Sequence, residues 1–286
     1  MRKLILSLSF LLIAAVLVYP QAVSFKLMGG LTWINGDDYN KGIVGQNQYL
    51  KATTTSMSGA YEKLSSGLKF EAEVINYLNP KVGIGLGGGY FRTSNESKVT
   101  SQGMLVDVPY DNESTYNSKI SVIPFFLNLH YLARPAPKLR LDLFAGPVFN
   151  IVQLNFENPS ITSTFSTTET VAFTASIASL GFQGGLGLNF EITPNIALIA
   201  DGSYRYGKVS NIKGNWSDIV SSPSGTTVIS NAEYYLWYYE NAQGGPYPQV
   251  GFYDKNGPTA GSISGARKAD INLSGIVILA GFKLSI

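Results

Sequence analysis

The chain of 286 residues is 45% hydrophobic and 12% aromatic but only 14% charged, whereas soluble domains average about 25% charged residues. It contains no Cys, which excludes disulfides, thiol chemistry and lipid attachment through an N-terminal Cys. Its single His excludes a His-rich metal site. The net charge of +2 comes from Arg2 and Lys3, because basic and acidic residues balance in the rest of the chain. Such a neutral chain lacks the basic surface of a nucleic-acid-binding protein, so no nucleic-acid partner is expected.

The first 24 residues have the parts of a secretory signal peptide. A basic start precedes an apolar run from Leu4 to Val18, which is shorter than the roughly 20 residues that a membrane-spanning helix needs. Pro20 ends the run, and small residues follow at Ala22 and Ser24. We therefore predict that residues 1–24 are a signal peptide, cleaved after Ser24 or alternatively after Ala22.

The rest of the chain alternates apolar with small or polar residues, which is the period of a β-strand. The pattern is clearest in residues 180–192 and 275–286, where the even positions are apolar. Eight segments follow it: 25–35, 67–78, 81–93, 119–132, 138–152, 177–192, 195–209 and 270–286. Long connections at 36–66, 94–118, 153–176 and 210–269 alternate with short ones at 79–80, 133–137 and 193–194. All the long connections therefore fall at one end of the strands.

This arrangement is typical of a bacterial outer-membrane barrel, which has short periplasmic turns and long outer loops. Each segment also provides the roughly 9–11 residues that a tilted membrane strand requires. We predict an all-β fold over residues 25–286: a closed, antiparallel, up-and-down transmembrane β-barrel of eight strands. Two more strands within the large fourth outer loop, about 210–269, would give a ten-stranded alternative.

The residues of two predicted strands resemble those of a known protein family. The stretches Ile123–Tyr131 and Leu141–Pro147 resemble the small outer-membrane β-barrel family of Gram-negative bacteria, which includes the OmpA-, OmpX- and OmpW-type barrels. The C-terminal pattern of Gly281, Leu284 and Ile286 is similar to the family's assembly signal, although it lacks the usual aromatic last residue. The resemblance implies an outer-membrane location, contact with membrane lipid and lipopolysaccharide, and assembly by the barrel-assembly machinery.

If the apolar face of each strand meets lipid, the opposite face lines the barrel interior. Five basic and five acidic residues and the single His share that inward parity, and such a balance suits a closed interior because unpaired buried charges are costly. The set is Lys26, Glu71, Glu73, Lys81, His130, Arg140, Asp142, Glu191, Asp201, Arg205 and Lys283. We expect opposite charges on neighbouring strands, among them Arg140, Asp142, Asp201 and Arg205, to bridge and occlude the lumen. Eight strands also leave an interior just wide enough for side chains.

Nothing in the sequence predicts catalysis, a metal site or a cofactor. The glycine run 83–89 resembles a dinucleotide fingerprint only in spacing, because it continues into a strand instead of opening a helix. Its odd positions form an inward strip of missing side chains that leaves room for long ones opposite. His130 is the only candidate for a His-dependent hydrolase, but it lies near a predicted periplasmic turn. A buried, carboxylate-bonded His is the better interpretation.

The fourth predicted loop is rich in aromatic residues, which suit a rigid contact surface for an unknown extracellular ligand. They are Tyr234, Tyr235, Trp237, Tyr238, Tyr239 and Tyr247. The same rings could instead belong to a hairpin above the membrane, with Tyr and Trp at its interface. We therefore predict a structural or surface-interaction barrel with a side-chain-filled lumen. The alternative is a narrow channel for small or hydrophobic solutes of the OmpW type, and a lipid-modifying barrel enzyme is a weaker one.

Overall fold

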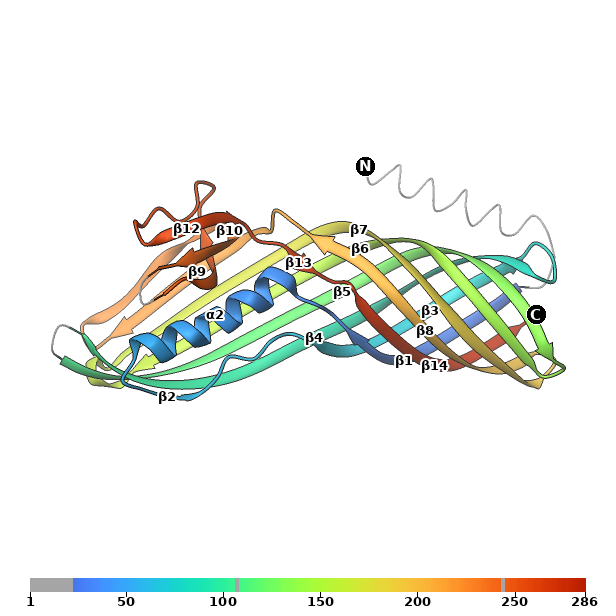
Figure 1. Ribbon diagram of the computed structural model, residues 1–286, viewed down its shortest axis with the longest axis horizontal. Coiled ribbons are helices and arrows are strands. Elements are labelled where there is room, and N and C mark those ends of the chain that lie inside the picture. The colour runs from blue at the N-terminus through green and yellow to red at the C-terminus, as the bar shows by residue number, and fades with distance from the viewer. Residues whose placement is uncertain (1–22, 106–107, 243–244) are drawn as a thin grey trace.

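The computed structural model describes residues 23–105, 108–242 and 245–286 and is almost entirely antiparallel sheet (Figure 1). Eight strands pair in sequence, and the last returns to the first, so the pairings form a ring. They are β1 (Val23–Trp33), β3 (Ser66–Tyr77), β4 (Val82–Leu105), β5 (Val108–Ala136), β6 (Leu139–Thr162), β7 (Thr167–Thr193), β8 (Ile196–Val209) and β14 (Gly275–Ser285). All eight correspond to the predicted segments.

The short connections β3–β4, β5–β6 and β7–β8 lie at one end of the ring, which we call the turn end. The start of β1 and the end of β14 lie there too, joined by backbone hydrogen bonds between Val23 and Ile286. Residues 1–22 of the predicted signal peptide fall outside the described residues. Its last two residues, Val23 and Ser24, begin β1, and the Ser24 hydroxyl lies 2.8 Å from that of Ser285. Cleavage after Ala22 would keep both of these residues in the strand.

The central strands are much longer than predicted. Strands β4 and β5 continue through the predicted loop 94–118, and β6 and β7 continue through most of 153–176, with the 3-10 turn η1 (Ser163–Phe165) between them. On β4, buried Ser97 and Ser101 alternate with exposed residues, and on β5 Ser114 is buried between partly exposed neighbours. Small hydroxyl residues therefore point inward where the sequence pattern showed only a polar run. The opposite end of the molecule, which we call the loop end, is consequently built mainly of sheet.

The predicted fourth loop adds four strands to this extension: β9 (Lys213–Ser222), β10 (Gly225–Asn241), β11 (Tyr247–Tyr253) and β12 (Ile263–Lys268). Strand β9 pairs with β7 at residues 168–174, beyond the part of β7 that pairs with β8. Strands β11 and β12 both pair with β10, and the short β13 (Ile271–Asn272) pairs with β8. On the other side, β2 (Ser56–Gly59) pairs with β4. These strands extend the sheet at the loop end without entering the ring of eight.

A helix that the sequence did not predict, α2 (Asp37–Thr53), lies along this extended sheet (Figure 1). Its Gly and Asn residues are poor helix formers, so tertiary packing must stabilise it. Gly42 and Gly45 face β11, and a side chain at Gly45 would overlap the carbonyl oxygen of Pro248. Among the described residues, no helix is long and apolar enough to cross a membrane.

Side chains of the ring alternate between two environments. Large apolar residues point outward, with Leu186 exposed by 46% and Phe282 by 60%, whereas Gly185 lies against the inward-facing Phe144. The interior itself has two layers. Near the turn end it holds charged and amide side chains beside a small apolar cluster of Ile75, Tyr77 and Leu132. Toward the loop end it is filled by an apolar core that includes Phe91, Phe156 and Phe173. The polar interior predicted from parity therefore occupies only the part of the ring near the turn end.

The apolar core reaches α2 through a series of rings. Tyr39 of α2 stacks on Phe156 with their centroids 5.0 Å apart, and Phe173 stacks on Phe252 of β11 at 4.4 Å. An ion pair holds the start of the helix: the buried Asp38 accepts hydrogen bonds from the half-exposed Arg267 at 2.5 and 2.6 Å and from the backbone N–H of Asp270 at 3.0 Å. Helix α2 is thus fixed to both the core and the loop-end strands.

The ion pair makes the attachment of α2 sensitive to acid. Burial alone would raise the pKa of Asp38, but the hydrogen bonds from Arg267 and Asp270 outweigh it and hold this pKa below its ordinary value. A lowered folded-state pKa stabilises the fold above the ordinary value, and this stabilisation disappears as pH falls toward the folded-state value. We predict constant hydrogen-exchange protection of α2 between about pH 5 and 8 and a loss below about pH 4. The Asp38→Asn variant should show weaker protection at neutral pH and no such acid loss. Equal acid loss in the variant would contradict this role.

Candidate functional site

The described interior near the turn end holds a connected set of charged side chains, which we call the lumen network. Its members are Lys26, Glu73, Asn128, His130, Asp142, Gln183 and Asp201. They come from six strands, because every second residue of each strand faces inward. Glycines make the space: a side chain at Gly85 would overlap the Glu73 carboxylate, and one at Gly187 the Asp201 carboxylate. The inward glycine strip predicted from residues 83–89 thus accommodates the network.

His130 lies at the centre of the lumen network and is fully buried. Its Nδ1 is 2.9 Å from Asp142 Oδ1, and its Nε2 is 2.9 Å from Glu73 Oε1. An ionised carboxylate can only accept hydrogen bonds, so both ring nitrogens must donate. A neutral imidazole has only one N–H, so donation to both carboxylates requires the doubly protonated, positively charged ring. Since neither nitrogen is free, His130 cannot act as a base toward a solute in this arrangement.

Lys26 connects Asp142 to the third acidic group, Asp201. Its Nζ donates to Asp142 Oδ2 at 2.7 Å and lies 3.6 Å from Asp201 Oδ2. Lys283 is also buried, and its Nζ donates to the hydroxyl of Tyr77 at 2.6 Å. With a charged His130, the cations Lys26, His130 and Lys283 balance Glu73, Asp142 and Asp201. Such balance is needed because an uncompensated buried charge is strongly destabilising.

Two amides complete the network: Gln183, whose inward parity the alternation in residues 180–192 indicates, and Asn128, which sequence reasoning missed. Asn128 donates to Glu73 Oε1 at 2.8 Å, and Gln183 donates to the Asn128 side-chain oxygen at 3.1 Å. Asn128 has the inward parity of His130 and could have been found by it. Lys69, also missed, shares the parity of Glu71 and pairs with it inside the ring.

Arg205 differs from its predicted role. Its guanidinium was expected to bridge to a carboxylate across the lumen, but it donates to the Leu273 carbonyl oxygen at 2.9 and 3.1 Å and to Thr32 at 3.3 Å. It also lies over the Phe91 ring, 4.0 Å from the centroid. Parity indicates the face of a side chain but not its depth, and Arg205 lies where the charged layer meets the apolar core.

The remaining predicted interior charges lie at the turn end. Arg140 pairs with Glu191, which also contacts Arg134 at 3.2 Å. Lys81, expected to point into the lumen, is exposed. The structure therefore separates Arg140, Glu191 and Lys81 from the lumen network that contains Glu73, His130, Asp142 and Asp201.

The six aromatic residues of the predicted contact surface do not share one exposed face. Tyr234 and Tyr238 pack against the apolar core, and the Tyr234 ring contacts Trp216 at a tilt. On the other face of β10, the Trp237 indole donates to the Asp254 carbonyl oxygen, and Lys268 lies over Tyr235. Tyr239 is buried against Tyr253, and Tyr247 contacts Tyr49 of α2. These rings therefore mostly join loop-end elements to each other.

The residues of the predicted assembly signal lie in or beside β14, which pairs with β1. Gly281 lies opposite Met28, and Leu284 lies opposite Phe25. Leu284 and Ile286 point outward, with Ile286 exposed by 77%. Contact with the assembly machinery stays a prediction.

His130 provides a test of the lumen network. The His130→Gln substitution removes the positive charge of the doubly protonated ring. It leaves Glu73 and Asp142 as close, poorly compensated charges. By analogy with broken buried ion pairs, we expect the unfolding free energy to fall by about 3–5 kcal/mol. Urea titration of the folded protein in detergent micelles measures the change. The control is Lys213→Gln, which removes an exposed loop-end cation paired with Glu233 and should leave stability almost unchanged. Equal stability of the two variants would contradict the proposed charge balance.

Comparison with known proteins agrees with this architecture. The model of the outer membrane protein beta-barrel domain family matches residues 6–235. Among curated proteins, no sequence matches the chain. Similar solved structures include the outer membrane protein OprG from Pseudomonas aeruginosa, with 13% identity, 92% of this chain and 95% of that chain covered, and a TM-score of 0.37. A major outer membrane protein from Thermus thermophilus shows 10% identity, coverage of 93% and 100%, and a TM-score of 0.35. The outer membrane protease OmpT from Escherichia coli shows 14% identity, coverage of 93% and 97%, and a TM-score of 0.33.

The family match over most of the chain confirms the resemblance found in the sequence: this protein belongs to the outer membrane β-barrel family.

Proposed function

We propose that the protein is a non-conducting outer-membrane barrel whose loop end interacts with the cell surroundings. The observation that carries this proposal is the filled interior. The lumen network occupies the ring near the turn end, and Arg205 lies over Phe91 where the apolar core begins. A wide water-filled pore for solutes is incompatible with these two layers, because their side chains are buried and bonded across the ring.

The outer surface of the ring supports a position within the bilayer. Leu27, Phe70, Leu129 and Leu143 are each more than half exposed on the outward faces of β1, β3, β5 and β6. In water such a continuous apolar surface would favour aggregation, whereas lipid accommodates it. In this orientation the turn end faces the periplasm, and the elaborated loop end lies outside the cell. The signal peptide predicted at residues 1–24 would direct the export.

The loop end provides the interaction module in this proposal. The Asp38–Arg267 ion pair joins helix α2 to β12, and the edge contact between Tyr49 and Tyr247 joins it to β11. Strand β11 is in turn paired with the β9–β10 hairpin. A binding surface on such a framework loses little conformational entropy when a partner binds. The partner is an unknown extracellular ligand, and lipopolysaccharide surrounds the module at the membrane surface.

One observation favours the second candidate, a narrow channel for small or hydrophobic solutes. A cavity of about 210 Å³ lies between α2, β11 and the extended sheet, and it is lined by Ile43, Tyr61, Tyr116, Phe156 and Phe252. The apolar part of these walls suits a hydrophobic solute, and Gln46, Glu157 and Asn158 add polar groups beside it. Passage from this cavity to the turn end would require both the apolar core and the lumen network to open, which is why we rank the channel second.

Conductance measurements distinguish these functions. The full-length protein without its signal peptide, reconstituted into planar bilayers, should give no stable single-channel currents, because no open path leads through the filled ring. A general diffusion porin in the same membranes is the positive control for insertion and recording. Large, stable currents from the unmodified protein would reject the non-conducting barrel and favour the channel.

A further inference from the structure

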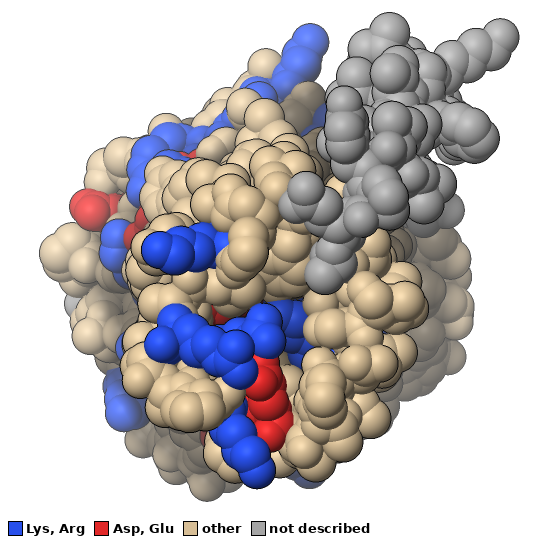
Figure 2. All heavy atoms as spheres, turned by 90° about the vertical axis from the view of Figure 1, so that its right-hand side faces the viewer, with Lys and Arg blue, Asp and Glu red and all other residues tan. Residues whose placement is uncertain are grey.

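The turn end of the ring carries cations that nearby carboxylates do not neutralise. Figure 2 faces this end and shows Lys and Arg side chains gathered around a small acidic area. Arg134 and Arg140 share one carboxylate, that of Glu191. Lys81 makes no ion pair among the described residues and is exposed. Three cations against one carboxylate leave two positive charges at this mouth, whereas Lys26, Lys69 and Arg267 elsewhere each have a carboxylate partner.

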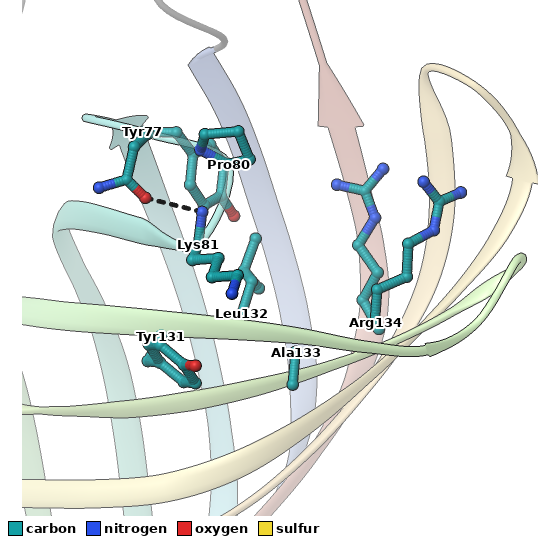
Figure 3. Close-up of a pocket in the computed structure, with 9 residues that line it drawn as sticks. Tyr77, Pro80, Lys81, Tyr131, Leu132, Ala133 and Arg134 are labelled. Carbon is teal, nitrogen blue, oxygen red and sulfur yellow. Dashed lines mark hydrogen bonds between the residues drawn. The ribbon is translucent and has the colours of Figure 1, made fainter.

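The three cations, Lys81, Arg134 and Arg140, line a cavity of about 700 Å³, and Glu191 lies beside it through its contacts with both arginines. Figure 3 shows Lys81 beside Pro80 on one side of it and Arg134 on the other. Tyr77 and Leu132, both buried, form part of its wall. The amide of Lys81 donates to the Asn79 side chain at 2.8 Å, which holds the β3–β4 turn in place. This space is large enough for a phosphate group together with part of the molecule that carries it.

The hydrogen-bonding capacity of the arginines is only partly used. Arg134 donates to the Pro137 carbonyl oxygen through Nε and Nη2, and Arg140 contacts Glu191 through Nη2. The Nε of Arg140 is buried and has no hydrogen-bond partner among the described atoms. Each guanidinium has five donors in a planar fork that matches phosphate oxygens. The apolar wall beside the cations reduces solvent screening of a bound anion.

We propose that this turn-end mouth, formed by Lys81, Arg134, Arg140 and Glu191, binds a phosphate group. A phosphate carries up to two negative charges and several acceptor oxygens, so it matches both the excess charge and the unused donors. The phosphate comes either from a free phosphorylated molecule or from a lipid headgroup at the membrane surface. The site is independent of whether the lumen conducts, because it lies outside the lumen network.

Binding measurements on the folded full-length protein test this site. Inorganic phosphate is titrated into the protein in nonionic micelles at low salt, and phosphatidylglycerol nanodiscs are compared with phosphatidylcholine nanodiscs. We expect the Arg134→Gln/Arg140→Gln variant to bind at least about tenfold more weakly. Lys81→Gln should weaken binding by a smaller factor, and added salt should weaken it in the unmodified protein. The matched control is Lys213→Gln, an exposed loop-end cation that should not affect binding.

A variant that is expected to bind phosphate more tightly distinguishes a specific effect from misfolding. Glu191→Gln removes the carboxylate that competes with phosphate for both arginines, so we expect it to bind phosphate more tightly than the unmodified protein. Binding of inorganic phosphate supports a free phosphorylated ligand, and binding only to phosphatidylglycerol nanodiscs supports a lipid headgroup. No binding of either probe, or unchanged binding in both the double arginine variant and Glu191→Gln, would overturn the proposal.

Discussion

The three buried carboxylates of the lumen network impose the strongest constraint on this structure. Glu73, Asp142 and Asp201 are removed from water, so each needs a cation close by. Lys26 and His130 meet that need from β1 and β5, at distances that allow little change in strand register. A shift of one residue in any of these strands would turn its charged groups toward the outside and its apolar groups inward. The lumen network therefore specifies the pairing of the ring as well as filling it.

The two layers of the interior have different roles at the two ends of the molecule. Charged groups near the turn end specify the register, and the apolar core toward the loop end supplies hydrophobic burial, since dispersion and water exclusion need no exact partner. Arg205 joins the layers, with its guanidinium on the Phe91 ring and on the Leu273 carbonyl oxygen. The core continues through Phe156 to Tyr39 of α2. A rigid loop end is thus a consequence of how the lumen is filled.

The alternation of residues predicted the eight strands and most of the interior charges, because inward and outward faces differ sharply in a membrane barrel. Alternation could not show how far the strands extend, since Ser97 and Ser114 on their inward faces look like loop residues. Helix α2 was missed because Gly42 and Gly45 lower its helix propensity. They are present because they allow close packing against β11. The partner of Arg205 could not be predicted either, since two residues of equal parity can lie at different depths in the ring. Contacts between strands distant in the sequence decide such partners, and one sequence does not contain them.

The central claim, a sealed interior, is tested most directly by thiol accessibility, because the chain has no Cys of its own. Single variants Asn189→Cys and Ser118→Cys place one thiol in each layer, at positions that are 1% and 2% exposed. Val228→Cys, at a position 66% exposed on β10, is the reference. We predict that a water-soluble maleimide labels the Val228→Cys variant at once and the two interior variants only after urea unfolding. Rapid labelling of both interior variants in the folded protein would contradict the sealed interior.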